Sequence, residues 1–300
     1  MPDQEPLLTL QGIKVTRGGN QILDFPQGKT VRIFSGDRVG IIGENGAGKS
    51  TLINCIIGEM PFKGKIERHF TLDDLGVQFQ YNAYDARLKV GELVEIISDS
   101  KLSSADLKSE MKDFELGPLL KKKISKLSGG ERQRMTLFLV LQKNPKLLIL
   151  DELTTGLDYQ KRQEILHTLK QKTTQKTVLS VTHYFEELAG WMGKLLILHK
   201  GHLVFWGAID TLRERYKWCY SIIEFPKDAL DRLNVKSFRQ VEVNNDTFGI
   251  FPESQEQAES FLKVCASKNI PAQNRLMDIY VMYTLALDDY ERNHEVLFSE

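Results

Sequence analysis

The sequence predicts an α/β fold with a central buried sheet. Three short apolar runs, Val39–Ile42, Lys146–Leu150 and Val178–Thr182, fit buried strands. Each of them is followed at once by polar or glycine-rich residues, and helical spacing of apolar residues fills part of the chain between the first two. Polar residues that directly follow buried strands are candidates for a functional site. The three runs that predict the sheet therefore also indicate which residues could form that site.

Composition limits the possible functions. The 300 residues are 41% hydrophobic, enough for one large domain and a small one. With 40 basic and 40 acidic residues there is no overall charge to attract nucleic acid, and we expect no nucleic-acid partner. The three cysteines show no metal-type spacing, which favours reduced thiols in a cytosolic protein. No apolar stretch reaches the roughly 18 residues of a membrane span, so we expect none.

The chain opens with short strands. Leu7–Val15 alternates apolar and polar residues as a half-exposed strand does, Gly18–Asn20 fits a turn, and Thr30–Phe34 fits a second strand. Beyond the first buried run, Lys65–Arg68 and Leu75–Gln80 are further strand candidates.

The run Val39–Ile42 leads into a stretch that fits the phosphate-loop pattern GxxxxGK[ST]. Its glycines can adopt backbone angles that turn successive N–H groups inward as an anion-binding nest, and the lysine adds a mobile positive charge. The helix expected after it would aim its N-terminus at the same point, and Ser50 could offer a hydroxyl to Mg²⁺. The predicted triphosphate cradle consists of Gly43, Glu44, Asn45, Gly46, Ala47, Gly48, Lys49, Ser50 and Thr51.

A helical region follows, from Leu88 to about Leu120, and after it comes Leu127–Arg134, with the sequence LSGGERQR, ahead of an apolar helix. Ser128 and Glu131 form a capping-box pair, which alone would explain a well-started helix. The alternative is a second anion site, formed by Ser128, Gly129 and Gly130 at the helix N-terminus.

The other two buried runs end in side chains suited to catalysis. Asp151 could hold Mg²⁺ through water, and Glu152, one residue further on, could polarise a water that attacks the γ-phosphate. His183 follows the third run. Adjacent acids and a lone histidine at strand ends are otherwise ordinary turn residues, so these assignments depend on the phosphate loop nearby.

The stretch LSGGERQR resembles the signature motif of ATP-binding-cassette (ABC) ATPases, and the resemblance extends from Leu7 to about Leu212. It implies ATP and Mg²⁺ as cofactors, with Glu152, His183 and Gln80 as catalytic residues and Ser50, Gln80 and Asp151 around the metal. Asp158 matches the loop at the dimer seam of the family. His183 matches its switch histidine, and Gln80 matches the glutamine between the sheet lobe and the helical lobe.

Two positions depart from the family pattern. Leu153 stands where the family usually has proline, and we expect this to alter loop stiffness rather than chemistry. Arg17 stands where many relatives have an aromatic residue that stacks on adenine. A guanidinium can also stack on a base, although an arginine in a surface turn is an equal alternative.

The resemblance also implies an architecture: a P-loop NTPase core sheet with an antiparallel β subdomain and a helical subdomain at about 85–135, all within residues 1–218. Two strands around His199–His202 and a helix through Tyr216 would close this domain. Residues 219–300 show short strand patterns and one helix at Gln255–Ala266, which predicts a small C-terminal α+β domain. Within it, Asn274–Tyr280 resembles a C-terminal motif of bacterial exporters of drugs, peptides and polysaccharides.

Together these features predict the ATPase subunit of an ABC exporter, which dimerises around two ATP molecules and drives a separate membrane permease. Such a subunit would be cytoplasmic and peripheral on the inner face of the membrane. Two alternatives stay open: a soluble ABC-type ATPase, for example one of iron–sulfur assembly, and the ATPase subunit of an importer.

Overall fold

The computed structural model describes residues 5–79, 83–217, 220–223, 239–244, 247–252, 254–270, 272–274 and 279–299. These fall into two compact units, one of residues 1–183 with 200–202 and the other of residues 184–199 with 203–300. The predicted domain boundary between residues 218 and 219 stays a prediction. Among the described residues, Cys55 and Cys265 are buried free thiols, and Cys219 lies outside them.

A parallel sheet forms the centre of the first unit. Its strands run in the order β6 (Leu75–Gln78), β7 (Leu147–Asp151), β8 (Thr177–Val181) and β4 (Arg38–Ile42). Every residue of β7 and β8 is buried, as expected for inner strands of a parallel sheet. The three predicted buried runs are thus confirmed, and their carboxyl ends lie side by side, with Asp151 in register with Val181.

Antiparallel strands make up the N-terminal part of the first unit. The long strand β1 (Leu8–Arg17) pairs with β2 (Asn20–Asp24), β3 (Thr30–Ile33) and β5 (Lys63–Arg68). The predicted turn after Arg17 is confirmed. Strand β2 was not predicted, because its five residues include only two apolar ones, and only one of the five is buried.

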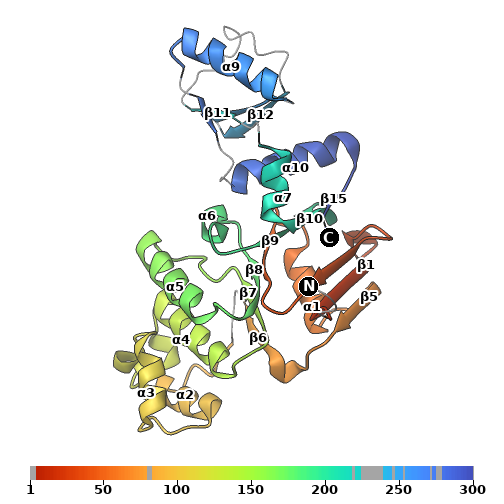
Figure 1. The fold of residues 1–300 in the computed structure, drawn as a ribbon. Coiled ribbons are helices and arrows are strands. Elements are labelled where there is room, and N and C mark those ends of the chain that lie inside the picture. The colour runs from red at the N-terminus through yellow and green to blue at the C-terminus, as the bar shows by residue number, and fades with distance from the viewer. Residues whose placement is uncertain are drawn as a thin grey trace. The chain divides into compact units, whose positions relative to one another are not determined.

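The helices of this unit are α1 (Lys49–Ile57), α2 (Val90–Ser98), α3 (Ala105–Lys112), α4 (Gly129–Gln142) and α5 (Tyr159–Lys172). Helices α2 to α5 group together, α2 packs on α4, and α4 packs on β6 (Figure 1). Short 3₁₀ turns also occur: η1 (Leu72–Asp74) lies between β5 and β6, and η2 (Gly117–Leu119) and η3 (Ile124–Lys126) lie between α3 and α4. Helix α5 was not predicted, since its mostly polar sequence buries only one narrow stripe.

The second unit begins with α6 (Phe185–Leu188), β9 (Lys194–His199), β10 (His202–Ala208) and α7 (Ile209–Arg215). Strands β9 and β10 are neighbours on either side of a tight turn, as predicted. Near the C-terminus, β15 (Leu297–Phe298) pairs in parallel with β10. In the part of the chain that the structure describes, no helix is both long and apolar enough to cross a bilayer.

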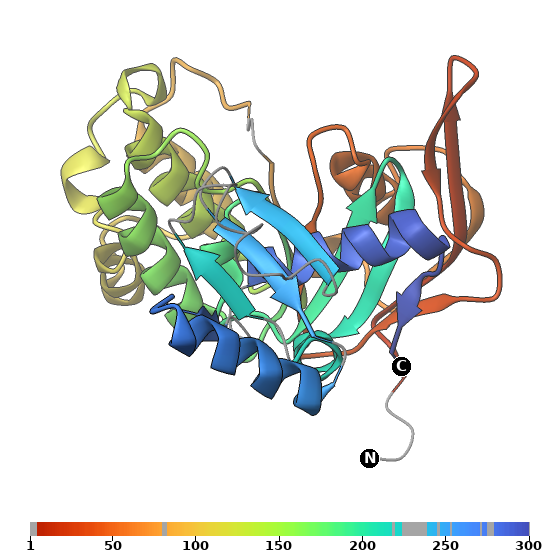
Figure 2. The same cartoon turned by 90° about the horizontal axis from the view of Figure 1, so that it is seen from above.

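The second unit also contains a small antiparallel sheet, ordered β12 (Arg239–Asn244), β13 (Thr247–Phe251), β11 (Tyr220–Ile223), β14 (Ala272–Asn274). Helix α9 (Gln255–Ser267) runs along this sheet (Figure 2). The alternating strands and the helix predicted here are therefore present.

A further helix of this unit, α10 (Ile279–Asn293), was not predicted. A buried carboxylate, that of Asp289, fastens it to α7 by accepting hydrogen bonds from the Tyr216 hydroxyl, at 2.8 Å, and from Arg215.

Candidate functional site

The predicted phosphate loop, residues 43–51, connects β4 to the first turn of α1. Gly46 and Gly48 have φ angles of 83° and 100°, in the region that favours glycine. A Cβ on Gly48 would lie 2.5 Å from Leu23 Cδ2 and 3.0 Å from the Ile22 carbonyl oxygen, so a side chain has no room there. Gly48 is also the N-cap of α1 and places no side chain over the helix N-terminus. The first N–H groups of α1 are therefore open to an anion.

Lys49 places its ammonium group inside the loop. The side chain is buried, and Nζ donates hydrogen bonds to the carbonyl oxygens of Gly43, at 2.7 Å, and Glu44, at 2.9 Å. Burial lowers the pKa of Lys49, while the carboxylates of Glu152, Asp151 and Glu44 act in the opposite direction. The loop thus holds a cation at the point where its amides converge.

Asp151 ends β7 as a buried carboxyl group and shares a hydrogen bond with the Ser50 side chain. Burial raises the pKa of Asp151, the charge of Glu152 raises it further, and the bond from Ser50 opposes the shift. A cation beside this carboxyl would favour its ionised form.

These two oxygen donors suit Mg²⁺, which keeps several waters and takes one or two protein carboxylates. The described residues contain no group of three or more His, Cys, Asp or Glu side chains that could hold a metal by themselves. Any Mg²⁺ here would therefore depend on water and phosphate oxygens as well as on Ser50 and Asp151.

Glu152 and His183 meet beyond the ends of β7 and β8. His183 Nδ1 lies 3.7 Å from Glu152 Oε1, and Thr155 Oγ1 donates to Glu152 Oε2 at 3.3 Å. Glu152 itself has a φ of 49°, a conformation that costs a non-glycine residue energy, and its N–H donates to the Val181 carbonyl at 2.9 Å. The strained backbone directs this carboxylate away from the end of the strand and beside the histidine.

The phosphate loop, Glu152 and the end of β1 line one open cavity of about 370 Å³. Predicted site residues from three distant segments meet there, including Arg17. The apolar lining residues Val15, Ile22 and Met60 were not predicted, because in the sequence they are ordinary apolar residues of a hairpin and a loop. The lining consists of Val15, Arg17, Ile22, Asn45, Gly46, Gly48, Lys49, Ser50, Thr51, Met60 and Glu152.

The predicted signature segment, Ser128–Gly130, is not part of this lining. Ser128 caps α4: its hydroxyl accepts from the Glu131 N–H at 3.3 Å, and Glu131 Oε2 accepts from the Ser128 N–H at 2.9 Å. The predicted capping box is confirmed. Ser128 and Gly129 are exposed, so their outward groups are available to another molecule.

Asp158 and Gln80 complete the predicted set. Asp158 caps α5 and accepts from the N–H of Lys161, at 3.0 Å, and from its Nζ, at 2.7 Å; these bonds lower the pKa of Asp158. It too lies outside the cavity lining. Gln80 lies outside the described residues.

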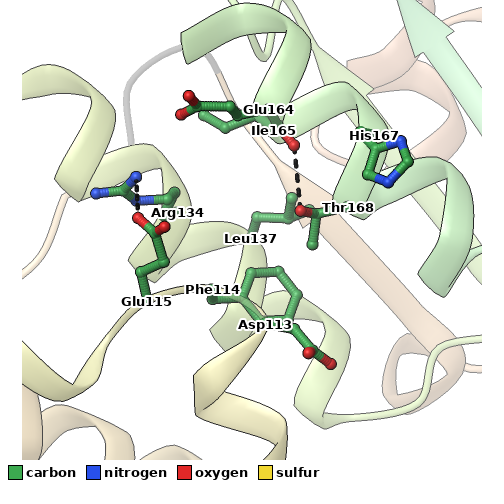
Figure 3. A pocket seen from close by; sticks show the side chains of 9 residues that line it. All are labelled: Asp113, Phe114, Glu115, Arg134, Leu137, Glu164, Ile165, His167 and Thr168. Carbon is green, nitrogen blue, oxygen red and sulfur yellow. Dashed lines mark hydrogen bonds and ion pairs between the residues drawn. The ribbon is translucent and has the colours of Figure 1, made fainter.

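A second cavity, of about 210 Å³, lies among α4, α5 and the residues after α3 (Figure 3). Its floor is apolar, and on its rim Arg134 is paired with Glu115 at 2.8 Å. Three carboxylates against one guanidinium make this cavity less suited to a triphosphate than the first cavity. The lining consists of Asp113, Phe114, Glu115, Arg134, Leu137, Glu164, Ile165, His167 and Thr168.

Part of this chain matches a known protein family. Residues 27–155 match the family model described as ABC transporter. This region contains the phosphate loop, the signature segment and the acidic pair at the end of β7.

Individual relatives differ in length and in direction of transport. Nod factor export ATP-binding protein I of Rhizobium etli is 28% identical over 272 residues, which cover 84% of this chain and 86% of that protein. Methionine import ATP-binding protein MetN 1 of Bacillus licheniformis is 27% identical over 273 residues, covering 81% and 82%. Cholesterol transporter ABCA5 of Rattus norvegicus is 30% identical over 261 residues, or 81% of this chain but only 15% of that transporter.

Among solved structures, a bacterial Atm1-family ABC exporter with ATP bound superimposes with a TM-score of 0.60 and 27% sequence identity. The match covers 70% of this chain and 40% of that one. It confirms the predicted fold class.

Proposed function

Because this chain contains an ATPase domain of the ABC transporter family, we propose that it binds ATP with Mg²⁺ at the phosphate loop and hydrolyses it as the ATPase subunit of a membrane transporter. The cavity that joins Lys49, Ser50 and Glu152 is the observation that carries the proposal. It combines an anion cradle, an oxygen donor for a metal and a carboxylate in the lining of one cavity. A triphosphate with its Mg²⁺ needs all three.

Binding depends on the backbone of the loop and on one side chain. The N–H groups around Gly46 and Gly48 and at the start of α1 donate to the β- and γ-phosphate oxygens. Lys49 exchanges its bonds to the Gly43 and Glu44 carbonyls for bonds to phosphate. Arg17, which lines the same cavity, takes the base.

Ser50 and Asp151 would hold Mg²⁺, with Gln80 as a further ligand. When bound, the ion neutralises negative charge on the phosphates and helps to align them. The neighbouring carboxylate of Glu152 orients the attacking water and accepts its proton. His183, beside Glu152, donates a hydrogen bond to the γ-phosphate and so joins the base to the reacting group.

The nucleotide site of a second copy is completed by Ser128, Gly129, Gly130 and Asp158. Their position outside the lining supports this assignment, since a helix N-terminus with exposed glycine suits phosphate but has no nucleotide within its own chain. ATPase domains of this family commonly dimerise. Each complete site then consists of the phosphate loop of one copy and the signature segment of the other.

The transporter would be an exporter, with this subunit on the cytoplasmic face of the membrane and bound to a separate permease. Support comes from the Nod factor export protein, which matches over most of both chains, and from the Atm1-family exporter. The methionine import protein, similar over nearly the same share, makes an importer subunit the second candidate. Expression with the genomic neighbours, followed by a transport assay in vesicles, separates the two directions.

The test of ATP hydrolysis is Glu152→Gln, which removes the base but keeps its shape. We expect ATP to stay bound, turnover to fall by about three orders of magnitude, and a stable ATP-dependent dimer to accumulate on size-exclusion chromatography. As a control, Glu186→Gln removes another carboxylate that does not line the cavity. Turnover in Glu152→Gln near that of the wild type would remove Glu152 as the base.

A further inference from the structure

We propose that Gly201 is a positioning residue for ATP binding, and that its turn, Lys200–His202, is stabilised in return when ATP is bound. This inference rests on the proposed binding of ATP at the phosphate loop. None of the three turn residues lines the cavity, so their effect is exerted through the residues that do.

Two backbone hydrogen bonds connect Gly201 to the phosphate loop and to β2. Gly201 N–H donates to the carbonyl oxygen of Ala47, in the middle of the phosphate loop, at 3.2 Å. The carbonyl oxygen of Gly201 accepts from the N–H of Asp24, the last residue of β2, at 2.8 Å. One peptide segment therefore ties the loop to β2, and both elements line the cavity.

Gly201 also has no room for a side chain. Its φ of 84° lies in the left-handed region, and a Cβ there would be 2.5 Å from the Ile22 carbonyl oxygen. The same oxygen would lie 3.0 Å from a Cβ on Gly48. The carbonyl of Ile22, whose residue lines the cavity, is thus held between two glycines, one in the loop and one in the turn. Movement at either one shifts the wall that faces the nucleotide.

The turn belongs to the same compact unit as the phosphate loop. Residues 200–202 belong to the first compact unit with the phosphate loop, whereas the residues before and after them in β9 and β10 belong to the second. The turn is joined to both strands by peptide bonds. Coupling between two sites is reciprocal, so if the turn favours ATP binding, bound ATP must stabilise the turn.

We expect a change at Gly201 to raise the ATP dissociation constant rather than to lower turnover. The loop contacts phosphate both before and during the reaction, and the loss of such uniform binding raises the ATP dissociation constant without lowering kcat. Glu152 and His183, which are placed for the chemical step, are held by the ends of other strands.

The test compares two glycines with nearly equal backbone angles. Gly28 has a φ of 80°, and a Cβ added there would meet open space, so Gly28→Ala introduces the same strain as Gly201→Ala without the clash. For Gly201→Ala we expect the ATP dissociation constant, measured by calorimetry, to rise about tenfold, with kcat at saturating ATP within about twofold of wild type. Gly28→Ala should leave both within about twofold. Should Gly201→Ala fail to fold, hydrogen exchange of the wild-type turn with and without an ATP analogue tests the inference without any variant.

Amide hydrogen exchange provides the reciprocal measurement. In wild type and in Gly28→Ala, a non-hydrolysable ATP analogue should slow exchange in peptides that contain residues 199–203; in Gly201→Ala this protection should be lost. Equal dissociation constants for the two alanine variants, or no protection of the turn in a wild-type protein that does bind the analogue, would overturn the inference. If the wild-type protein does not bind ATP at all, the proposed function fails instead.

Discussion

Two helix N-termini in this molecule contain glycines and are suited to phosphate, but they are built in opposite ways. At α1 the N-cap is Gly48, no side chain bonds to the first N–H groups, and Lys49 is buried beside them. At α4 the N-cap is Ser128, and its capping box with Glu131 already satisfies part of the helix end. The first N-terminus lies in a cavity, while the second lies outside it.

This difference indicates different roles in ATP binding for the N-termini of α1 and α4. The N-terminus of α1 is prepared for an anion before any ligand arrives, since its amides are open and a cation is in place. The N-terminus of α4 is capped by its own side chains without a ligand and lies outside the lining of the cavity at the phosphate loop. On our account it contributes only when a second copy brings a nucleotide to it.

The largest expected effect separates the two N-termini directly. Lys49→Ala removes a buried cation from the loop and should raise the ATP dissociation constant of the isolated chain about 100-fold, the loss of roughly 2.7 kcal/mol of charge-assisted hydrogen bonding. Ser128→Ala should change that constant less than twofold, because the isolated chain does not use α4 to bind ATP. Calorimetry with monomeric protein measures both. A large loss of affinity in Ser128→Ala would break the comparison.

A smaller effect, on the free energy of unfolding, is expected at Asp151, the carboxyl group beside the phosphate loop. Burial and Glu152 raise the pKa of Asp151, so the folded chain holds a proton there more tightly than the unfolded chain. Stability from this group is full below the ordinary aspartate pKa of about 4 and is lost as the pH rises through the raised value.

Asp151→Asn should therefore stabilise the ligand-free protein at pH 7, with the gain fading as the pH approaches 4. Urea unfolding in the presence of a chelator measures this. A variant that is less stable than wild type at pH 7 would contradict the assigned shift. The same variant should lose ATPase activity, since it lacks the proposed metal ligand.

The smallest effect concerns the base end of the cavity. Arg17 lines the cavity at the end of β1, and its replacement by alanine should weaken ATP binding by about 0.5 to 1 kcal/mol if its guanidinium stacks on adenine. Affinity for inorganic triphosphate should stay the same, because that ligand has no base. Unchanged ATP affinity in calorimetry would favour the alternative of an arginine in a surface turn.

The phosphate loop and the acidic pair could be predicted from the sequence because their chemistry is local. Glycine spacing determines the turn, and Asp151 and Glu152 directly follow a strand whose burial is evident from Leu147–Leu150. The parallel register, which was not predicted, then brings the ends of β7 and β8 together.

What escaped prediction depends on contacts between distant residues. Ile22 and Met60 line the cavity only because β2 and the residues after α1 approach the loop, and neither has an unusual sequence context. The role of Gly201 is clear only from the carbonyl oxygens of Ala47 and Ile22 around it. Helix α5 has too few apolar residues for its spacing to be evident.

The central claim, that each active site is shared between two copies, is tested most directly by mixing two inactive variants. Dimers of Lys49→Ala and dimers of Ser128→Arg should each lack ATPase activity, because every site contains one damaged half. In a mixed dimer, one site combines both defects and the other combines an intact Lys49 with an intact Ser128.

The measurement is ATP turnover of mixed dimers isolated through two different affinity tags. As a control, Ser125→Arg places the same charge three residues earlier and should stay active by itself. Our account predicts that the mixed dimer recovers a substantial part of the wild-type turnover, up to about half. Failure to recover turnover in a mixed dimer that still assembles with ATP would contradict it.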